Sequence, residues 1–149
     1  MQNITRLFDF PYYQLEHFNL PDALVTKYNN EWVKTSTQEY INKANALSRA
    51  LLNLGIQKND KIAVISSNNR TEWHISDIGI LQVGAQNIPI YPTISSEDYE
   101  YILNHSEAKY CFVSDQVVYD KLKEVQSRIP LLIDVYSFNE ISGCKKWSD

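Results

Sequence analysis

The stretch that decides the fold is LQVGAQNIPIYPTISSEDYEYILNHSEAKYCFVSD, residues 81–115. It places two β-like runs around a helix-like run, with almost no polar residues between them. Gly84 ends the preceding helical pattern, Pro92 ends the first strand, and Ser95 begins the next helix. Because strands that alternate with helices favour right-handed crossovers, the stretch predicts neighbouring parallel strands.

The same order of apolar strand, polar capping stretch and amphipathic helix recurs along the chain after Gly55. The predicted strands, whose apolar content is nearly continuous as in sheets buried on both faces, are Lys61–Ser66, Asn87–Tyr91, Tyr110–Ser114 and Leu131–Val135. The predicted helix starts are Asn69 with Glu72, Ser95 with Asp98, and Ser114 or Asp115. We therefore expect an open, layered α/β fold with a mostly parallel sheet flanked by helices. Pro89 should lie at a sheet edge or a bulge.

A β-hairpin is predicted before these units, from residues 23–28 and 31–35 joined by Asn29-Asn30, which tolerates the positive φ of tight turns. Residues 1–20 hold aromatic side chains around Pro11 that we expect to be packed rather than exposed: Phe8, Phe10, Tyr12, Tyr13 and Phe18. After the hairpin, Ser36 and Glu39 form a capping box. The following helix carries an apolar face of Tyr40, Ala44, Leu47, Leu51 and Leu54 and ends at Gly55.

The composition of the chain excludes some classes of function. The chain has 149 residues, 44% of them hydrophobic, with a formal net charge of −4 and no Lys/Arg cluster, which argues against nucleic-acid binding. Cys111 and Cys144 form no C-x-x-C pair, and Cys111 lies in an apolar run, as expected of a reduced cytoplasmic protein. No signal-peptide pattern and no apolar stretch of about 20 residues occurs, and peripheral membrane contact stays open.

No chemical motif emerges from the residues. The glycines occur singly, at Gly55, Gly79, Gly84 and Gly143, so no glycine-rich loop could close around a phosphate. The remaining ligand candidate is Ser66-Ser67-Asn68-Asn69, which follows a predicted parallel strand, although helix capping already accounts for Asn69. We therefore predict no catalytic, cofactor-binding or metal-binding residue in this chain.

The other polar groups have structural explanations. His17, His74 and His105 lie far apart, so surface or helix-face positions are favoured over metal ligation. A Ser-His-Asp triad is not supported, because G-x-S-x-G is missing. Glu97, Asp98 and Glu100 suit a helix N-terminus better than a carboxylate pair for acid–base chemistry. Tyr99, Ile102 and Leu103 form a packing stripe.

Residues 46–115, ALSRALLNLGIQKNDKIAVISSNNRTEWHISDIGILQVGAQNIPIYPTISSEDYEYILNHSEAKYCFVSD, carry a family resemblance. Together with the hairpin before them, they resemble the N-terminal portion of the adenylate-forming enzymes, specifically the long-chain fatty acyl-CoA synthetases. Asn69-Arg70-Thr71-Glu72-Trp73 is similar to that family's N-R-x-E-W motif, and Pro92-Thr93 with residues 106–109 is similar to its long-chain group. The resemblance covers about residues 20–115.

The resemblance implies a two-step ligase that uses ATP with Mg²⁺. A fatty acid and ATP would form an acyl-adenylate with release of pyrophosphate, and coenzyme A would then form the thioester. The family's phosphate-gripping loop ending in P-K-G, its later acidic motifs and its catalytic lysine have no counterpart here and are expected beyond Asp149. We accordingly expect no cofactor bound to this chain.

The implied organisation is a single N-terminal fragment of an adenylation domain. It would comprise the aromatic lead-in and hairpin (1–35), the repeated α/β units (36–136) and a truncated tail (137–149). A natural short protein that has kept the scaffold is the competing explanation. We favour a piece of a longer ligase, because the tail has no capping element.

If the chain is an N-terminal fragment, the partners of the parent enzyme are a fatty acid substrate and the rest of the adenylation domain. The chain alone is then expected to be inactive. A binding or dimerisation module on the same fold is the alternative, with a homodimer formed through the aromatic lead-in and the edge-strand proline. A nucleotide-binding receiver-like domain is disfavoured, because the acidic cluster and the glycine loop are missing.

Overall fold

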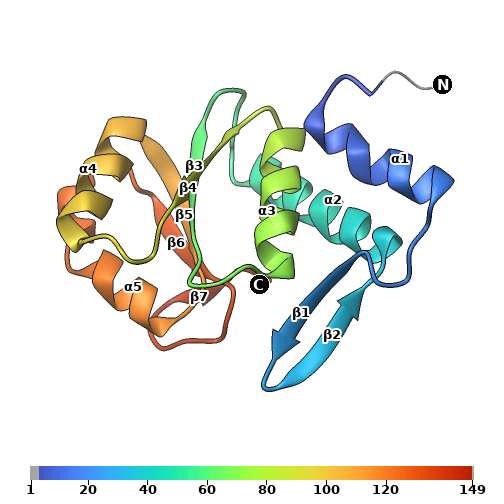
Figure 1. Ribbon diagram of the computed structural model, residues 1–149. Coiled ribbons are helices and arrows are strands. Elements are labelled where there is room, and N and C mark those ends of the chain that lie inside the picture. Colours follow the sequence, from blue (N-terminus) through green and yellow to red (C-terminus); the bar gives the residue numbers. More distant parts are fainter. Residues whose placement is uncertain (1–3, 149) are drawn as a thin grey trace. The chain divides into compact units, whose positions relative to one another are not determined.

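The computed structural model describes residues 4–148, which form two compact units (Figure 1). The hairpin unit comprises the residues up to Lys58 together with Asn69–Ala85. The sheet unit comprises Asn59–Asn68 together with the residues from Gln86 onward. Each unit has its own helices and strands.

The sheet unit contains one parallel sheet with the strand order β4-β3-β5-β6-β7. Its strands are β3 (Lys61–Ile65), β4 (Gln86–Ile90), β5 (Ala108–Val113), β6 (Asp134–Ser137) and β7 (Lys145–Lys146). The predicted α/β class is therefore confirmed. Pro89 lies in β4, at the edge of the sheet, where its missing amide breaks no ladder.

The fourth predicted strand, Leu131–Val135, is wrong by three residues at its start, because β6 begins at Asp134. A short 3₁₀ helix, η2 (Gln126–Arg128), precedes it, and the Leu132 amide donates to the Ile129 carbonyl at 3.1 Å in a turn. Of the apolar run, Leu132 is buried while Leu131 and Ile133 are exposed. The run is thus a turn with one inward side chain, and periodicity alone could not separate it from a strand.

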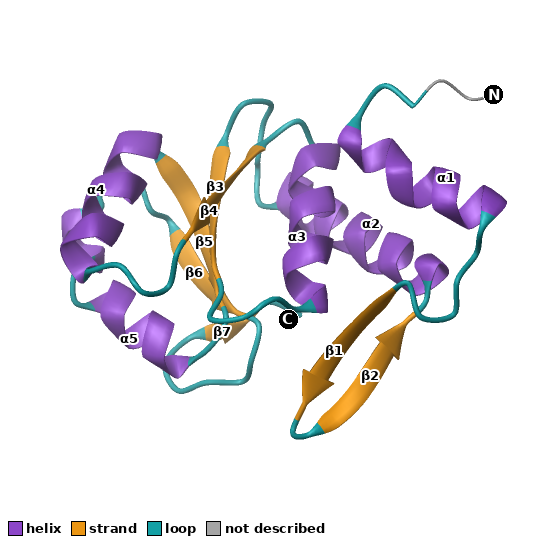
Figure 2. Ribbon diagram, viewed as in Figure 1, coloured by secondary structure: helices purple, strands orange, loops and turns teal. Residues whose placement is uncertain are grey.

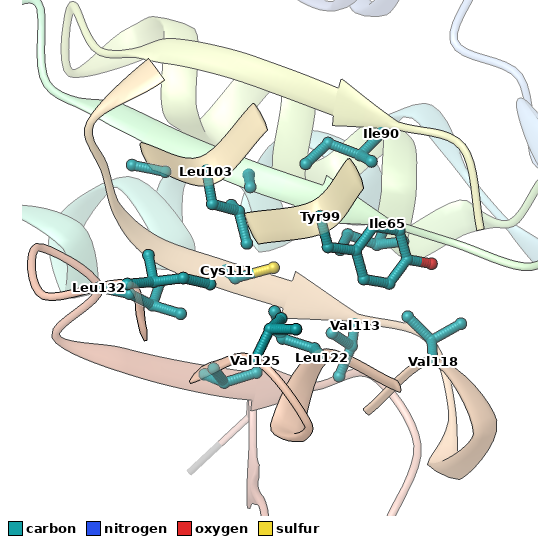
Figure 3. Close-up of a cluster of buried hydrophobic side chains, with 14 of the residues drawn as sticks. Ile65, Ile90, Tyr99, Leu103, Cys111, Val113, Val118, Leu122, Val125 and Leu132 are labelled. Atoms are coloured by element: carbon teal, nitrogen blue, oxygen red, sulfur yellow. The ribbon is translucent and has the colours of Figure 1, made fainter. Parts of the chain in front are cut away.

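Two helices, α4 (Ser96–Ser106) and α5 (Gln116–Lys123), cover the core of the sheet unit. The buried cluster joins side chains of these helices to side chains of β5, and it includes Tyr99, Leu103, Val118, Leu122, Cys111 and Val113 (Figure 3). The predicted packing stripe on α4 is therefore confirmed, as is the burial of Cys111. Ser95 and Asp98 form the predicted capping box of α4, which accounts for the acidic start of that helix.

The hairpin unit contains η1 (Leu7–Asp9), α1 (Phe10–His17), β1 (Leu24–Tyr28), β2 (Glu31–Thr35), α2 (Thr37–Asn53) and α3 (Thr71–Gln82) (Figure 2). The hairpin is confirmed, and Asn29 and Asn30 both have positive φ, at 48° and 66°. The capping box of Ser36 and Glu39 is also confirmed. A tight turn of this kind fixes the register of β1 against β2.

The lead-in differs from its prediction. It folds as the helix α1, which packs against α2 and buries Pro11. Phe10, Tyr12 and Phe18 are nevertheless 54%, 39% and 62% exposed, so the expectation that these aromatic side chains are packed is wrong for these three. A helix of eight residues can bury only one narrow stripe, and the three rings lie off it.

The helices α2 and α3 approach each other closely at Gly79. A Cβ atom there would lie 2.9 Å from Leu47 Cδ2 and 3.1 Å from the Ala44 carbonyl oxygen. The predicted apolar face of α2 is buried at Tyr40, Ala44, Leu47 and Leu51, whereas Leu54 is 44% exposed. Leu54 is the C-cap residue, just before Gly55 with a φ of 82°, so it has left the buried face.

Candidate functional site

The sheet unit has one place where the direction of strand order reverses. After β3 the chain adds β4 on one side and then β5 on the other, so β3 and β5 are neighbours. In open parallel sheets, ligands bind outside the carboxyl ends of the strands at such a switch point. The predicted candidate segment at Ser66 follows β3 there, and Ser114 and Asp115 follow β5.

Hydrogen bonds tie the ends of the two strands together. The Ser67 amide donates to Ser114 Oγ at 2.9 Å, and the Ser67 hydroxyl donates to Asp115 Oδ2 at 2.7 Å. The Ser114 hydroxyl donates to the same oxygen at 2.6 Å. The other carboxylate oxygen of Asp115 accepts the Val118 amide at 3.1 Å, so Asp115 is the N-cap of α5.

The electrostatics of Asp115 follow from these contacts. Partial burial alone would raise the pKa of this carboxyl, but hydrogen bonds from Ser114 and Ser67 and from backbone amides of α5 hold it below its usual value. The group is therefore a carboxylate with both oxygens occupied by donors. It is poorly suited to act as a general base, because its lone pairs are already engaged.

This arrangement does not fit a triphosphate. A phosphate at the start of α5 would need the free amides and the positive dipole end of the helix. Asp115 already places a negative charge there and takes up the Val118 amide. The switch point is thus a polar clamp between the ends of β3 and β5.

Asn69, the last residue of the predicted segment, does not have its predicted role. The N-cap of α3 is Arg70, without a side-chain cap, and Asn69 is exposed. Asn69 also belongs to the hairpin unit, whereas Ser66–Asn68 belong to the sheet unit. The spacing of Asn69 and Glu72 imitates a capping box, but Glu72 is held by another partner.

That partner is Arg70. Its guanidinium donates to both carboxylate oxygens of Glu72, with Nε to Oε2 at 2.9 Å and Nη2 to Oε1 at 2.7 Å. The Tyr28 hydroxyl donates to Glu72 Oε2 at 2.5 Å, and Arg70 lies over the Tyr28 ring at 5.5 Å. The side chains of Arg70 and Glu72 are only 6% and 15% exposed. The cluster ties the hairpin to the first turn of α3.

The pKa directions agree with a structural role. Burial opposes the charge on Glu72, yet the hydrogen bonds of Arg70 and Tyr28 hold the pKa of Glu72 below its usual value. Burial, with the neighbouring Glu72 carboxylate, raises the pKa of Tyr28. Next to them, the Thr71 amide donates to Thr26 Oγ1 at 2.8 Å. Arg70 and Glu72 therefore stay charged, and the cluster is an anchor rather than a site of proton transfer.

This cluster was missed from the sequence alone. The only local indication of the pair was the N-R-x-E-W motif, because an arginine and a glutamate at the start of a helix can form an ion pair when both are buried. Its tyrosine partner, 44 residues away from Glu72, has no local signal.

The histidines are placed as predicted, since His17, His74 and His105 all lie exposed on helices. Within residues 4–148, no group of three or more His, Cys, Asp or Glu side chains could hold a metal ion. Over the same range, no helix is both long and apolar enough to cross a membrane.

Comparison with known proteins agrees with this architecture. A family model described as AMP-binding enzyme matches residues 16–148, and the chain therefore belongs to this family. The chain is 34% identical over 104 residues to the long-chain-fatty-acid–CoA ligase FadD15 of Mycobacterium bovis, which covers 70% of this chain and 17% of the relative. It is 26% identical over 118 residues to the long-chain-fatty-acid–CoA ligase ACSBG2 of Xenopus laevis, covering 79% of this chain and 16% of the relative.

A solved structure shows the same fold. The crystal structure of the anthranilate CoA ligase AuaEII in complex with anthranoyl-AMP superposes with a TM-score of 0.80 at 20% identity. The match covers 97% of this chain and 26% of that one. The chain thus spans about one sixth of the length of the two curated relatives and about a quarter of the solved ligase.

Proposed function

We propose that this chain is the N-terminal scaffold part of a long-chain fatty acid–CoA ligase. In the complete protein, ATP, a fatty acid and coenzyme A would give acyl-CoA, AMP and pyrophosphate. The observation that carries this proposal is the family match over residues 16–148, together with relatives named as long-chain-fatty-acid–CoA ligases. The fold supports it as well.

The chain by itself is inactive on this proposal. Support comes from the switch point, where the Asp115 carboxylate takes up an amide of α5 and its negative charge opposes a phosphate. ATP, Mg²⁺ and coenzyme A would then be bound by residues of the complete ligase outside this chain. The fatty acid and the rest of the adenylation domain are the corresponding partners. We expect a cytoplasmic protein, with peripheral membrane contact open to test.

The test compares two proteins. The purified 149-residue chain and the longest product of the reading frame that contains it are assayed for acyl-CoA with ATP, Mg²⁺, coenzyme A and a labelled long-chain fatty acid. Product from the longer protein alone supports the proposal. Turnover by the 149-residue chain overturns its inactivity, and no turnover by either overturns the ligase assignment.

A dimerisation module is the second candidate, favoured by exposed apolar side chains in the hairpin unit. Leu7 is 65% exposed, and Trp32 in β2 is 68% exposed. Large exposed apolar side chains can contribute to a protein contact when they lie in one patch. Light scattering over a dilution series measures whether the chain is a dimer at low concentration, and a monomer throughout excludes this candidate.

A further inference from the structure

The strand β2 has both an open edge and exposed apolar side chains, a combination that is uncommon in soluble proteins. Among the described strands it pairs with β1 alone, so its outer edge has no strand partner (Figure 1). Trp32 and Val33 project from opposite faces of β2, and both are exposed, at 68% and 45%. A two-stranded hairpin is marginal in water, and an open edge with apolar side chains is a template for another strand.

The turn determines which backbone groups point outward. In a tight turn the amide of the fourth residue bonds to the carbonyl of the first, so the Glu31 backbone faces Tyr28 in β1. Backbone groups alternate in direction along an antiparallel strand. The amides and carbonyls of Trp32 and Lys34 therefore point away from β1, toward the open edge.

We propose that β2 pairs antiparallel with β2 of a second copy of this chain, which makes a four-stranded sheet around a two-fold axis at Val33. In this register Trp32 lies opposite Lys34 of the second copy, and Lys34 lies opposite Trp32 of the second copy. These are the residues whose backbone groups face outward, so both form hydrogen-bonded pairs. The register follows from the strand's own sequence.

The side chains fit this register. Val33 meets Val33 of the second copy in a non-hydrogen-bonded pair, where Cα atoms are about 4.5 Å apart and side chains are closest. The aliphatic stem of each Lys34 lies beside the opposite Trp32 ring, where it can pack while its ammonium stays paired within its own chain. The indole ring already lies next to a lysine of its own chain, since Lys27 Nζ lies 5.7 Å from its centroid.

Charge does not oppose the pairing. Two Lys34 side chains would lie diagonally across the axis, but each is paired with Asp22 at 3.2 Å within its own chain. Glu31 lies opposite Thr35, so no like charges face each other directly. The arrangement is self-complementary, as an isologous two-fold contact requires. It gives the dimerisation candidate a specific surface and does not depend on ligase activity.

The first test is sedimentation equilibrium of the 149-residue chain from about 10 µM to about 1 mM, a range suited to a weak contact. We expect a concentration-dependent monomer–dimer equilibrium that Val33→Lys weakens at least about tenfold, since two lysines then face each other. Val117→Lys is the matched control. Val117 is 74% exposed on α5, outside the hairpin unit, so the dimer should persist.

The second test traps the register. Val33→Cys, in a Cys144→Ser background, should form an intermolecular disulfide on mild oxidation, because the expected Cα separation lies within the range of about 4.4–6.8 Å for disulfides. Val25→Cys in the same background should not. Cys111 is buried and serves as an internal control.

Circular dichroism confirms that each variant is folded. A monomer at every concentration overturns the proposal and leaves the open edge for a strand of a longer protein. A dimer that Val33→Lys does not weaken overturns it in favour of another surface.

Discussion

The sheet unit buries a continuous cluster of apolar side chains between α4, α5 and its parallel strands, whereas the hairpin unit also depends on a buried ion pair and on threonine hydroxyls. In the sheet unit, the stability is distributed over many apolar contacts. In the hairpin unit, the attachment of β1 to α3 depends on Arg70, Glu72 and Tyr28. Point substitutions should therefore act unequally in the two units, even at similar burial.

The largest effect is expected at Arg70. Arg70→Met leaves the Glu72 carboxylate buried without its cation, and removal of one partner of a buried pair costs about 3–5 kcal/mol. Urea unfolding followed by tryptophan fluorescence, with amide exchange resolved by unit, measures the loss. We expect lost protection in the hairpin unit first.

The matched variant for this prediction is Arg70→Met with Glu72→Gln. Glutamine keeps an acceptor for Tyr28 but carries no charge, so the double variant should recover much of the lost stability. A single Arg70→Met variant that loses less than about 1 kcal/mol would show that the pair is not the anchor.

These two units also show how far sequence reasoning reaches. In the sheet unit, three of the predicted strands, the capping box at Ser95 and the edge position of Pro89 followed from patterns within about 15 residues. The failure at Leu131 arose because a turn with one inward leucine and a short strand have the same apolar composition. Local patterns therefore predict elements that consist of a continuous apolar run or of a helix with its own cap.

The hairpin unit shows the limit. The turn at Asn29 was readable because its φ requirement is local. The partner of Glu72 was not, because Tyr28 is 44 residues away and the pair depends on how β1 meets α3. The polar clamp at the switch point could be predicted only in part. The sequence made Ser66–Asn69 a candidate segment, but its contacts with Ser114 and Asp115 depend on the strand order.

Gly79 tests helix packing in the hairpin unit. Gly79→Ala gains about 1 kcal/mol of helix propensity but places a methyl group 2.9 Å from Leu47 Cδ2 and 3.1 Å from the Ala44 oxygen. Overpacking costs about 1–3 kcal/mol, so a net loss of about 1 kcal/mol is expected in thermal or urea unfolding. Adding Leu47→Ala removes the Cδ2 atom that makes the shortest contact, so the double variant should lose less stability than the sum of the two single losses. Full additivity would mean that the contact is not the cause.

Asp115 gives a smaller, pH-dependent effect in the sheet unit. Its folded pKa is lowered, so its contribution is complete above the unfolded pKa of about 3.9 and is lost as pH falls through the lower folded value. Asp115→Asn keeps a capping acceptor and should cost about 1 kcal/mol or less at pH 7. The difference from the unsubstituted chain should shrink below about pH 4. A difference that stays constant from pH 7 to pH 2 would assign the loss to shape rather than charge.

Pro89 should give the smallest change in stability, within about 0.5 kcal/mol for Pro89→Ala, because it lies exposed on the edge strand β4. Its consequence is expected in association, since alanine restores an amide at a sheet edge that proline leaves without a donor. The measurement belongs in a Val33→Lys background, where β2 pairing is already weakened. If Pro89→Ala increases self-association in this background, proline protects the edge of β4 from pairing, whereas the edge of β2 is open to a partner. Unchanged association would mean that β4 is protected by its neighbours rather than by proline.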